Sequence, residues 1–235
     1  AVTIDSELHT AAQTEAALAC AAALGARHRL VAVSDLEQAE FRANRPDRCY
    51  LCKRRRFGIL KDIARQSGLS RVVDGTSASD EGDFRPGRRA LQELAIDSPL
   101  RDAGLTREEI RAAARALGVP GWDRPSESCL ATRIPYGTAI SGELLAQVAA
   151  AEEAVRECGF RTVRVRHHGP VARIELEPAE LERALHPPLR ARLLEGVRRA
   201  GYVYVALDLQ GYRTGAMNEV LDSPAAGKPL PPGPA

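Results

Sequence analysis

The chain has 235 residues, 44% of them hydrophobic, which is enough for one large domain or two modest ones with a real core. A formal net charge of +2 is too small for a protein that binds nucleic acid over its whole surface, and five cysteines, an odd and sparse number, argue against a secreted disulfide framework. No apolar run reaches the roughly 18 residues of a membrane span, and the N-terminus lacks the features of a signal peptide. We therefore expect a cytoplasmic protein with reduced thiols that associates with neither nucleic acid nor membrane.

The first half of the chain alternates predicted strands and helices. Strands are expected at 1–4, 29–33 and 71–73, and helices at 10–24, 54–66 and 106–117. This alternation predicts a parallel sheet with helices on both faces. Ligands of such sheets bind beyond the carboxyl ends of the strands. We place Cys49, Asp74 and Cys129 in loops just past a strand or helix, so we expect them to meet at one edge of the sheet.

The second half changes to an α+β pattern with local hairpins. A helix is expected at 141–158, strands at 162–166 and 171–176 around a His168-Gly169-Pro170 turn, helices at 179–185 and 189–200 interrupted by Pro187-Pro188, and a last strand at 202–209. This change predicts a domain boundary near residue 137, with domains at 1–137 and 138–222. The proline-rich tail at 223–235 is expected to be disordered.

Three cysteines stand out as candidate ligands. Cys49 and Cys52 form a Cys-x-x-Cys pair, and Cys129 lies far along the chain. A structural zinc site, a thioredoxin-like redox pair and a chance pair would each explain the first two. A structural zinc site usually has four protein ligands, and only Cys129 is available as a third. A thioredoxin-like redox pair would open a helix directly after the first strand, which this pair does not. Three thiolates can also hold three corners of an iron–sulfur cluster and leave one iron open.

Several basic side chains are candidates for anion binding. Lys53 follows the cysteine pair directly, so its charge would lower the pKa of a thiol or bind a substrate carboxylate. Arg164 and Arg166 alternate on one strand and share a face, and with Arg133 they could enclose a phosphate or carboxylates. If the hairpin pairs symmetrically, Glu175 faces Arg164, and a cross-strand ion pair on a solvated sheet explains this arrangement equally well.

Short motifs along the chain carry a resemblance to one family. They are Asp5-Ser6-Glu7-Leu8, Arg48-Cys49-Tyr50-x-Cys52-Lys53, Asp74-Gly75-Thr76, Asp83-Phe84-Arg85-Pro86-Gly87, Ser98-Pro99-Leu100, Cys129-Leu130-Ala131-Thr132-Arg133-Ile134-Pro135-Tyr136-Gly137, Val163-Arg164-Val165-Arg166-His167 and Leu207-Asp208-Leu209-Gln210-Gly211-Tyr212-Arg213. Through them the chain, to about residue 222, resembles the LarE family of ATP-dependent sulfur transferases of nickel-pincer nucleotide biosynthesis. The resemblance implies an α/β fold, in which a Rossmann-like PP-loop ATP pyrophosphatase domain precedes a smaller α+β substrate domain.

The resemblance also implies a reaction and a pocket. The family adenylates a carboxylate of pyridinium-3,5-biscarboxylic acid mononucleotide with ATP, and a sulfur source then displaces AMP to leave a thiocarboxylate. A pocket of arginines would suit this small nucleotide substrate. The substrate-binding residues that we expect are Lys53, Thr132, Arg133, Glu152, Arg164, Arg166 and Glu175.

Family members obtain sulfur in two ways. In one variant a single cysteine, equivalent to Cys129, gives up its own sulfur. In the other that cysteine joins a Cys-x-x-Cys pair to hold a [4Fe-4S] cluster. This chain has all three cysteines, Cys49, Cys52 and Cys129, and therefore resembles the cluster variant. An open iron would bind hydrosulfide from inorganic sulfide or another sulfur donor. The family forms homo-oligomers, so we expect one here.

One motif of the family does not occur in this sequence. The PP-loop, Ser-Gly-Gly-x-Asp-Ser, would cradle the phosphates of ATP, and by comparison with the family the chain begins at the second strand. We therefore expect either a piece of a longer protein or a protein that does not activate ATP alone. The remaining candidates for binding ATP are Ser6, Asp74 and Gly75, and the acidic loop at 80–83 is a candidate for Mg²⁺.

Two other functions remain open. A PP-loop enzyme that thiolates tRNA would also use three cysteines around a cluster, although the near-neutral charge and the lack of an RNA-binding appendage argue against it. A non-catalytic zinc-binding module of the same fold would explain the missing PP-loop. Iron with acid-labile sulfide, as opposed to zinc, would separate the enzymes from the module.

Overall fold

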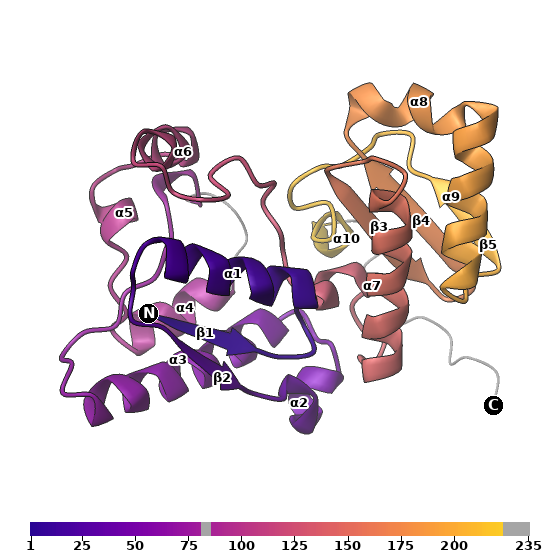
Figure 1. The fold of residues 1–235 in the computed structure, drawn as a ribbon. Coiled ribbons are helices and arrows are strands. Elements are labelled where there is room, and N and C mark those ends of the chain that lie inside the picture. The colour runs from indigo at the N-terminus through magenta and orange to yellow at the C-terminus, as the bar shows by residue number, and fades with distance from the viewer. Residues whose placement is uncertain (81–85, 223–235) are drawn as a thin grey trace.

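A computed structural model describes residues 1–80 and 86–222 of the protein (Figure 1). The first half contains β1 (Val2–Asp5), α1 (Ala11–Ala23), β2 (Arg29–Ala32), α2 (Ala39–Arg42), α3 (Arg48–Gln66), α4 (Gly87–Glu93), α5 (Pro99–Asp102) and α6 (Arg107–Ala116), with short 3₁₀ turns η1 (Asp35–Glu37), η2 (Ala78–Asp80) and η3 (Leu130–Arg133). The second half contains α7 (Gly142–Arg156), β3 (Val163–His168), β4 (Val171–Leu176), η4 (Pro178–Glu180), α8 (Leu181–Leu185), α9 (Pro187–Arg199), β5 (Tyr204–Leu207) and α10 (Glu219–Asp222).

The first half has a small parallel sheet. β1 and β2 pair in parallel, from Val2 with Arg29 to Asp5 with Ala32. The expected helix α1 follows β1, and Thr10 caps it by accepting a hydrogen bond from the backbone of Gln13. In the part of the chain that the structure describes, the strand expected at 71–73 is reduced to one parallel bridge between Val73 and Asp97. The predicted parallel sheet is therefore present, but it is smaller than expected.

Helix α3 carries the cysteine pair. It begins at Arg48 and not at residue 54, so Cys49 and Cys52 lie in its first turns and not in a loop as predicted. Residues 48–53 contain neither glycine nor proline, and the backbone N–H groups of Tyr50 and Leu51 donate to the carbonyl of Asp47 to start the helix. The phenol of Tyr50 donates to Glu93 and thereby fixes α3 against α4. The helix therefore holds both thiols on a rigid element.

The second half is a three-stranded sheet covered by helices. β3 and β4 form the predicted antiparallel hairpin, in which Arg164 lies opposite Glu175, and β5 pairs in parallel with β4. Helix α9 begins at Pro187, because the first turn of a helix needs no backbone donor from proline. The two prolines therefore start this helix, whereas the sequence prediction began it after them.

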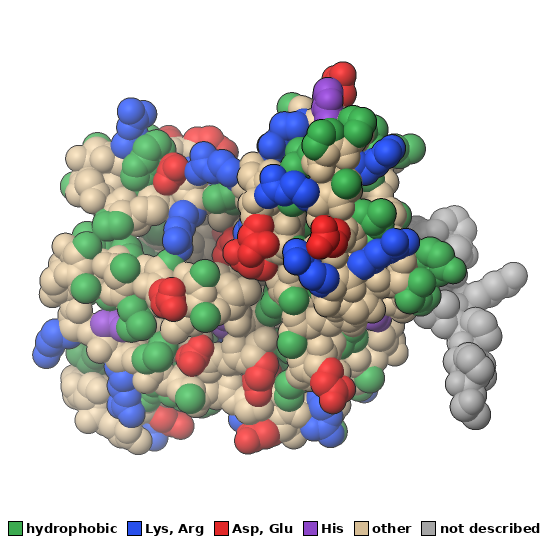
Figure 2. All heavy atoms as spheres, turned by 45° about the vertical axis from the view of Figure 1, so that its right-hand side comes forward, with side chains coloured by type: hydrophobic (Ala, Val, Ile, Leu, Met, Phe, Trp, Pro, Cys, Tyr) green, Lys and Arg blue, Asp and Glu red, His purple; other side chains and the backbone are tan. Residues whose placement is uncertain are grey.

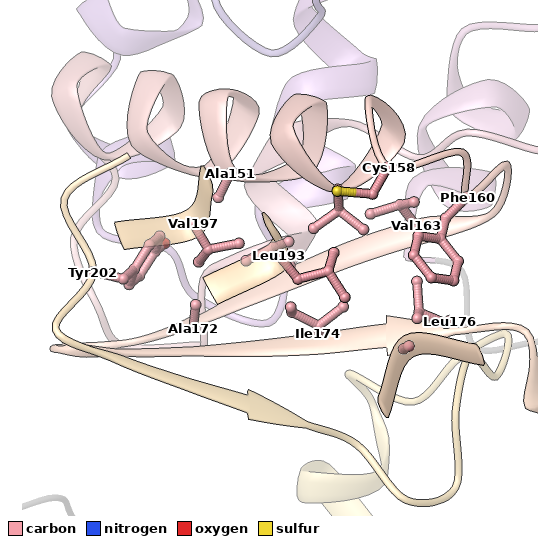
Figure 3. Close-up of a cluster of buried hydrophobic side chains, with 13 residues drawn as sticks. Ala151, Cys158, Phe160, Val163, Ala172, Ile174, Leu176, Leu193, Val197 and Tyr202 are labelled. Atoms are coloured by element: carbon pink, nitrogen blue, oxygen red, sulfur yellow. The ribbon is translucent and has the colours of Figure 1, made fainter. Parts of the chain in front are cut away.

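Two apolar cores hold the molecule together. Figure 3 shows the larger one, where side chains from α7 and α9 pack on the three-stranded sheet; its members include Ala151, Val155, Cys158, Phe160, Ile174, Leu193, Val197 and Tyr202. The second core contains Leu8, Phe41, Leu130, Ala131, Ile134, Ile140, Leu145 and Val148. Helix α7 contributes to both, through Leu145 and Val148 at its start and Ala151 and Val155 further along. The boundary expected near residue 137 stays a prediction, and it falls within the second core.

The surface and the ends add three observations. Lys and Arg side chains are interspersed with Asp and Glu on the face shown in Figure 2, which accords with the small net charge. Among the described helices, none has the length and apolar character needed to cross a membrane. The tail expected to be disordered, at 223–235, and most of the acidic loop at 80–83 lie outside the described residues.

Candidate functional site

A cavity of about 580 Å³ lies where the two halves meet. Its walls come from the start of α3, the segment at 126–136, strand β3 and the segment at 212–218 that follows β5. A volume of this size suits a small organic ligand such as a mononucleotide. We call it the central cavity.

The three predicted thiols gather at one side of the central cavity. Cys49 and Cys129 line it, and Cys52 packs beside Cys129 against the second core. Each of the three thiols interacts electrostatically with the other two, although Cys49 and Cys129 are far apart in the sequence. The structure therefore brings the two cysteine motifs together, as the sequence analysis expected. Asp74 does not line this cavity, so the expectation that it joins them is wrong.

Burial raises the pKa of two of these thiols. The pKa of Cys49 is raised by burial and by the neighbouring Cys129, whereas the charges of Arg48 and Lys53 lower it. Burial likewise raises the pKa of Cys52 to about 12, against the charge of Arg56. Both thiols are therefore protonated at neutral pH, and a metal that binds them would have to displace their protons.

The chemistry of these side chains fits an iron–sulfur cluster, because three free thiols lie near one another at a partly buried site. As the side chains stand, residues 1–80 and 86–222 contain no group of three or more His, Cys, Asp or Glu already arranged to hold a metal ion. Cys49, Cys52 and Cys129 would therefore have to turn toward a common centre to ligate a cluster.

Arg133 and Glu152 form a buried clamp beneath Cys129. Nε and Nη2 of Arg133 lie 2.7 and 3.1 Å from the two carboxylate oxygens of Glu152. Nη1 of Arg133 donates to the carbonyl oxygens of Ser128 and Cys129. Glu152 also accepts from the backbone N–H of Val165, 3.1 Å away. Neither member of the clamp lines the central cavity, so the structure places both of these predicted substrate-binding residues behind its wall.

Glu175 pairs with Arg166 and not with Arg164. Arg164 stands opposite Glu175 in the hairpin, but the carboxylate binds Nε and Nη2 of Arg166, on the same sheet face, at 2.9 Å each. Glu175 also accepts from Arg173 at 3.0 Å. The side chain of Glu175 is fully buried and does not line the cavity, whereas Arg164 and Arg166 do. Glu175 therefore orients Arg166 behind the cavity wall.

Arg164 is left without a carboxylate partner among the described residues. It donates to the carbonyl oxygens of Val163 and Ser126, each at 2.7 Å, and its guanidinium lies 5.2 Å from the ring centre of Tyr212. Burial lowers the pKa of Arg164, and the positive charge of Arg133 lowers it further. A cation in this position is suited to bind an anionic ligand.

Thr132 and Lys53 also line the central cavity, as predicted. The hydroxyl of Thr132 donates to the carbonyl of Cys129 at 2.8 Å, and its own carbonyl accepts from Arg166 at 2.7 Å. The stem of Lys53 crosses Gly87, where a Cβ atom would come within 2.7 Å of it. Within the described residues the amine of Lys53 has no carboxylate partner. A glycine at position 87 therefore gives Lys53 room to lie along the cavity wall.

The cations of the central cavity fall into two groups. Arg107 pairs with Asp80, Arg166 with Glu175 and Arg213 with Glu219. Arg48, Lys53 and Arg164 line the same cavity without a carboxylate partner in the part of the chain that the structure describes. Sequence reasoning missed Arg48, although this residue directly precedes Cys49 in the first cysteine motif. It also named no site residue in the segment at 212–218, of which every residue lines the cavity, although Tyr212 and Arg213 belong to the last family motif.

The residues predicted to bind ATP lie apart from the central cavity. The hydroxyl of Ser6 accepts from Arg56, whose guanidinium also pairs with the buried carboxylate of Asp35. The carboxylate of Asp74 accepts from the backbone of Thr76 at 3.2 Å and the hydroxyl of Ser98 at 2.6 Å. Gly75 is exposed. Ser6, Asp74 and Gly75 therefore do not line the central cavity, and Ser6 contacts Arg56, whose charge interacts with Cys52 and Cys129.

Comparisons with known proteins identify relatives that span most of the chain. No family model matches it. The chain is 36% identical over 209 residues to an uncharacterized protein of Synechocystis, covering 89% of this chain and 78% of that protein. It is 33% identical over 171 residues to an uncharacterized protein of Methanocaldococcus jannaschii, covering 73% and 66%.

A third relative has an assigned activity. The chain is 37% identical over 221 residues to pyridinium-3,5-bisthiocarboxylic acid mononucleotide synthase of Lactiplantibacillus plantarum, covering 94% of this chain and 79% of that protein. Identity of this extent covers nearly the whole chain and agrees with the family resemblance of its motifs. The chain therefore belongs to the LarE family, the family of the Lactiplantibacillus synthase.

Proposed function

We propose that this protein is an ATP-dependent sulfur transferase that converts carboxylates of pyridinium-3,5-biscarboxylic acid mononucleotide to thiocarboxylates. The observation that carries the proposal is the central cavity, which combines Cys49 and Cys129 with cations that have no carboxylate partner among the described residues. The name of the Lactiplantibacillus relative supports the choice of substrate.

The proposed reaction has two steps. A substrate carboxylate oxygen attacks the α-phosphorus of ATP, and pyrophosphate leaves, so the product is an acyl-adenylate. A sulfur nucleophile then attacks the acyl carbon, the C–O bond to AMP breaks, and AMP leaves with the bonding electrons. With hydrosulfide as the nucleophile, its proton goes to water. Each thiocarboxylate therefore consumes one ATP and one sulfide, and releases one AMP and one pyrophosphate.

The residues of the cavity have distinct roles in this proposal. Lys53 and Arg164 bind the anionic groups of the substrate, and Arg166, held by Glu175, completes that wall. The clamp of Arg133 and Glu152 fixes the loop that carries Cys129. ATP with Mg²⁺ would bind beyond the ends of β1 and β2, near Ser6 and the turn at Asp74-Gly75. The working enzyme would be a homo-oligomer, which sedimentation measurements can test.

Cys49, Cys52 and Cys129 would hold a [4Fe-4S] cluster. When bound, the cluster would supply an open iron to which hydrosulfide can attach. Because the sulfur atoms of all three cysteines would be bound to the cluster, none of them would be transferred to the substrate. The protein would then turn over repeatedly instead of losing sulfur from Cys129.

Product analysis tests the proposed reaction. The protein, reconstituted anaerobically with iron and sulfide, is incubated with the mononucleotide, ATP, Mg²⁺ and sulfide. We expect more than one thiocarboxylate per protein chain by mass spectrometry, with AMP and pyrophosphate in equal amounts. Absence of any sulfur-for-oxygen exchange, with a substrate that binds, would overturn the proposal. Bound zinc in place of iron would favour the non-catalytic module.

Cysteine variants test the source of sulfur. Cys49→Ala, Cys52→Ala and Cys129→Ala should each abolish bound iron and the absorbance of the cluster, and Cys158→Ala, in the other core, should change neither. If sulfur transfer persists when Cys49 and Cys52 are both replaced, Cys129 gives up its own sulfur and the cluster assignment is wrong.

A further inference from the structure

Arg48 is the most deeply buried cation of the central cavity. Its side chain is 1% exposed, although it contributes to the cavity wall beside Cys49. Nη1 donates to the side-chain oxygen of Asn44, and the guanidinium lies 5.3 Å from the ring centre of Tyr136. No carboxylate of the described residues pairs with it. A buried charge of this kind is unfavourable unless an anion accompanies it.

One edge of the Arg48 guanidinium lacks strong hydrogen-bond acceptors. Nη2 lies 3.4 Å from the thioether sulfur of Met217, which is a weak acceptor, and Nε has no hydrogen-bond partner. Nε and Nη2 form the edge that binds a carboxylate with two parallel hydrogen bonds. Arg133 and Arg166 use this same edge to bind Glu152 and Glu175. Arg48 therefore presents an intact carboxylate-binding edge without a carboxylate from the described chain.

Met217 covers this edge from the segment that follows β5. The thioether is unbranched and flexible, so it can move aside at low cost. An arriving carboxylate would replace the weak contact to sulfur with two charge-assisted hydrogen bonds, which are the stronger interactions. The exchange also brings an anion to the buried charge.

We propose that Arg48 binds a carboxylate of the substrate at the thiol side of the central cavity and displaces Met217 in doing so. This inference rests on the proposed function for the identity of the ligand. Lys53 and Arg164, the other cations without carboxylate partners, bind the remaining anionic groups. The site therefore selects a ligand that carries a carboxylate in addition to its phosphate, because each anionic group has its own cation.

Binding measurements with two matched probes test this assignment. Nicotinic acid mononucleotide carries one pyridinium carboxylate, and nicotinamide mononucleotide has an uncharged carboxamide in its place. The wild-type protein should bind the first at least about tenfold more tightly, as expected for one charge-assisted hydrogen-bonded group. Arg48→Met should remove this preference, whereas Arg164→Met should weaken both probes and keep it. Arg54→Met, an exposed change on the same helix, should alter neither affinity.

A third probe separates this inference from the proposed function. Pyridine-3,5-dicarboxylate has the carboxylates without the nucleotide. If neither mononucleotide binds but the dicarboxylate binds in a manner that requires Arg48, the inference holds and the nucleotide substrate is wrong. The inference is overturned if wild type shows no preference for a carboxylate, or if Arg48→Met keeps the preference. Loss of iron binding in Arg48→Met with an unchanged preference would show that Arg48 serves Cys49 alone.

A second readout does not depend on correct folding of the Arg48→Met variant. Met217 is the one methionine of the sequence, so a ¹³C-methyl label reports on its position, and its signal is assigned by its loss in Met217→Leu. Nicotinic acid mononucleotide should shift this signal in the wild-type protein, and nicotinamide mononucleotide should shift it much less. Equal shifts with both probes would contradict displacement of Met217 by a carboxylate.

Discussion

At the residue scale, buried ion pairs decide which predicted residues reach the ligand. Arg133 and Glu152 carry the charges expected of a substrate pocket, but they neutralise each other behind the cavity wall. The sequence cannot distinguish an arginine that binds substrate from an arginine that binds a buried carboxylate, because both can occur in the same strand or loop. The structure distinguishes them by their hydrogen-bond partners: Arg133 binds the carboxylate of Glu152, whereas Arg164 binds a backbone carbonyl.

Removal of Glu152 should be costly. Glu152→Ala leaves the buried charge of Arg133 without its partner, so we expect the free energy of unfolding to fall by about 3–5 kcal/mol. Urea denaturation followed by circular dichroism measures this change. Glu153→Ala is the matched control, because Glu153 is exposed and its ion pair with Arg156 contributes at most about 1 kcal/mol. Similar losses in both variants would contradict a specific role of the clamp.

The same carboxylate should make stability depend on pH. Burial alone would raise the pKa of Glu152, but the charge of Arg133, its hydrogen bonds, Arg156 and the Val165 amide outweigh burial and hold the pKa below its usual range. The folded pKa therefore lies below the unfolded value of about 4.3. The stabilisation is present above that value and is lost as pH falls through the folded pKa. Glu152→Gln should flatten this acid limb in measurements of unfolding free energy against pH, and an unchanged limb would contradict the assignment.

At the element scale, the sequence predicted most helices and the hairpin, and it failed at particular boundaries. Capping by Thr10 and Thr106 and the glycine after each helix marked α1 and α6 correctly. Asp47 provides no side-chain cap, so the sequence predicts the start of α3 too late and predicts a loop at the cysteine pair. The place of the segment at 212–218 in the cavity wall could not be predicted, because it depends on tertiary contacts of Met217 and Tyr212 and not on periodicity.

Gly211 controls the path of that segment. Its φ is +71°, and a Cβ atom there would come within 2.6 Å of the carbonyl oxygen of Leu176. That carbonyl accepts from the backbone N–H of Tyr212 at 2.7 Å. Gly211→Ala should therefore weaken binding of nicotinic acid mononucleotide and cost about 1–3 kcal/mol of stability. Gly58→Ala, in the interior of α3 with nothing within 4 Å, should instead stabilise the protein by up to about 1 kcal/mol. Retained affinity in Gly211→Ala would show that the segment does not need this turn.

At the scale of the whole molecule, helix α7 joins the two cores. Because it buries side chains in both, loss of one core removes packing from the other. Figure 1 shows α7 at the junction of the two halves, beside the segment that leads to it from α6. We infer that the halves do not unfold independently, although they have separate sheets.

A two-probe denaturation experiment tests this coupling. Trp122, the one tryptophan of the chain, lies between α6 and α7 and reports on the first half by its fluorescence. Far-ultraviolet circular dichroism reports on all helices. The two transitions should coincide in urea, as expected for cooperative unfolding. Separate midpoints would show that each half unfolds alone and that α7 does not couple them.

Asn44 has a consequence for how the two cysteine-bearing segments are held together. Its side-chain amide nitrogen lies within 3.3 Å of the carbonyl oxygens of Ile134, Pro135 and Thr138, and its backbone carbonyl accepts from the backbone N–H of Gly137. These bonds directly join the chain just before Cys49 to the chain just after Cys129. The link between the two cysteine-bearing segments therefore does not depend on the length of the polypeptide between them.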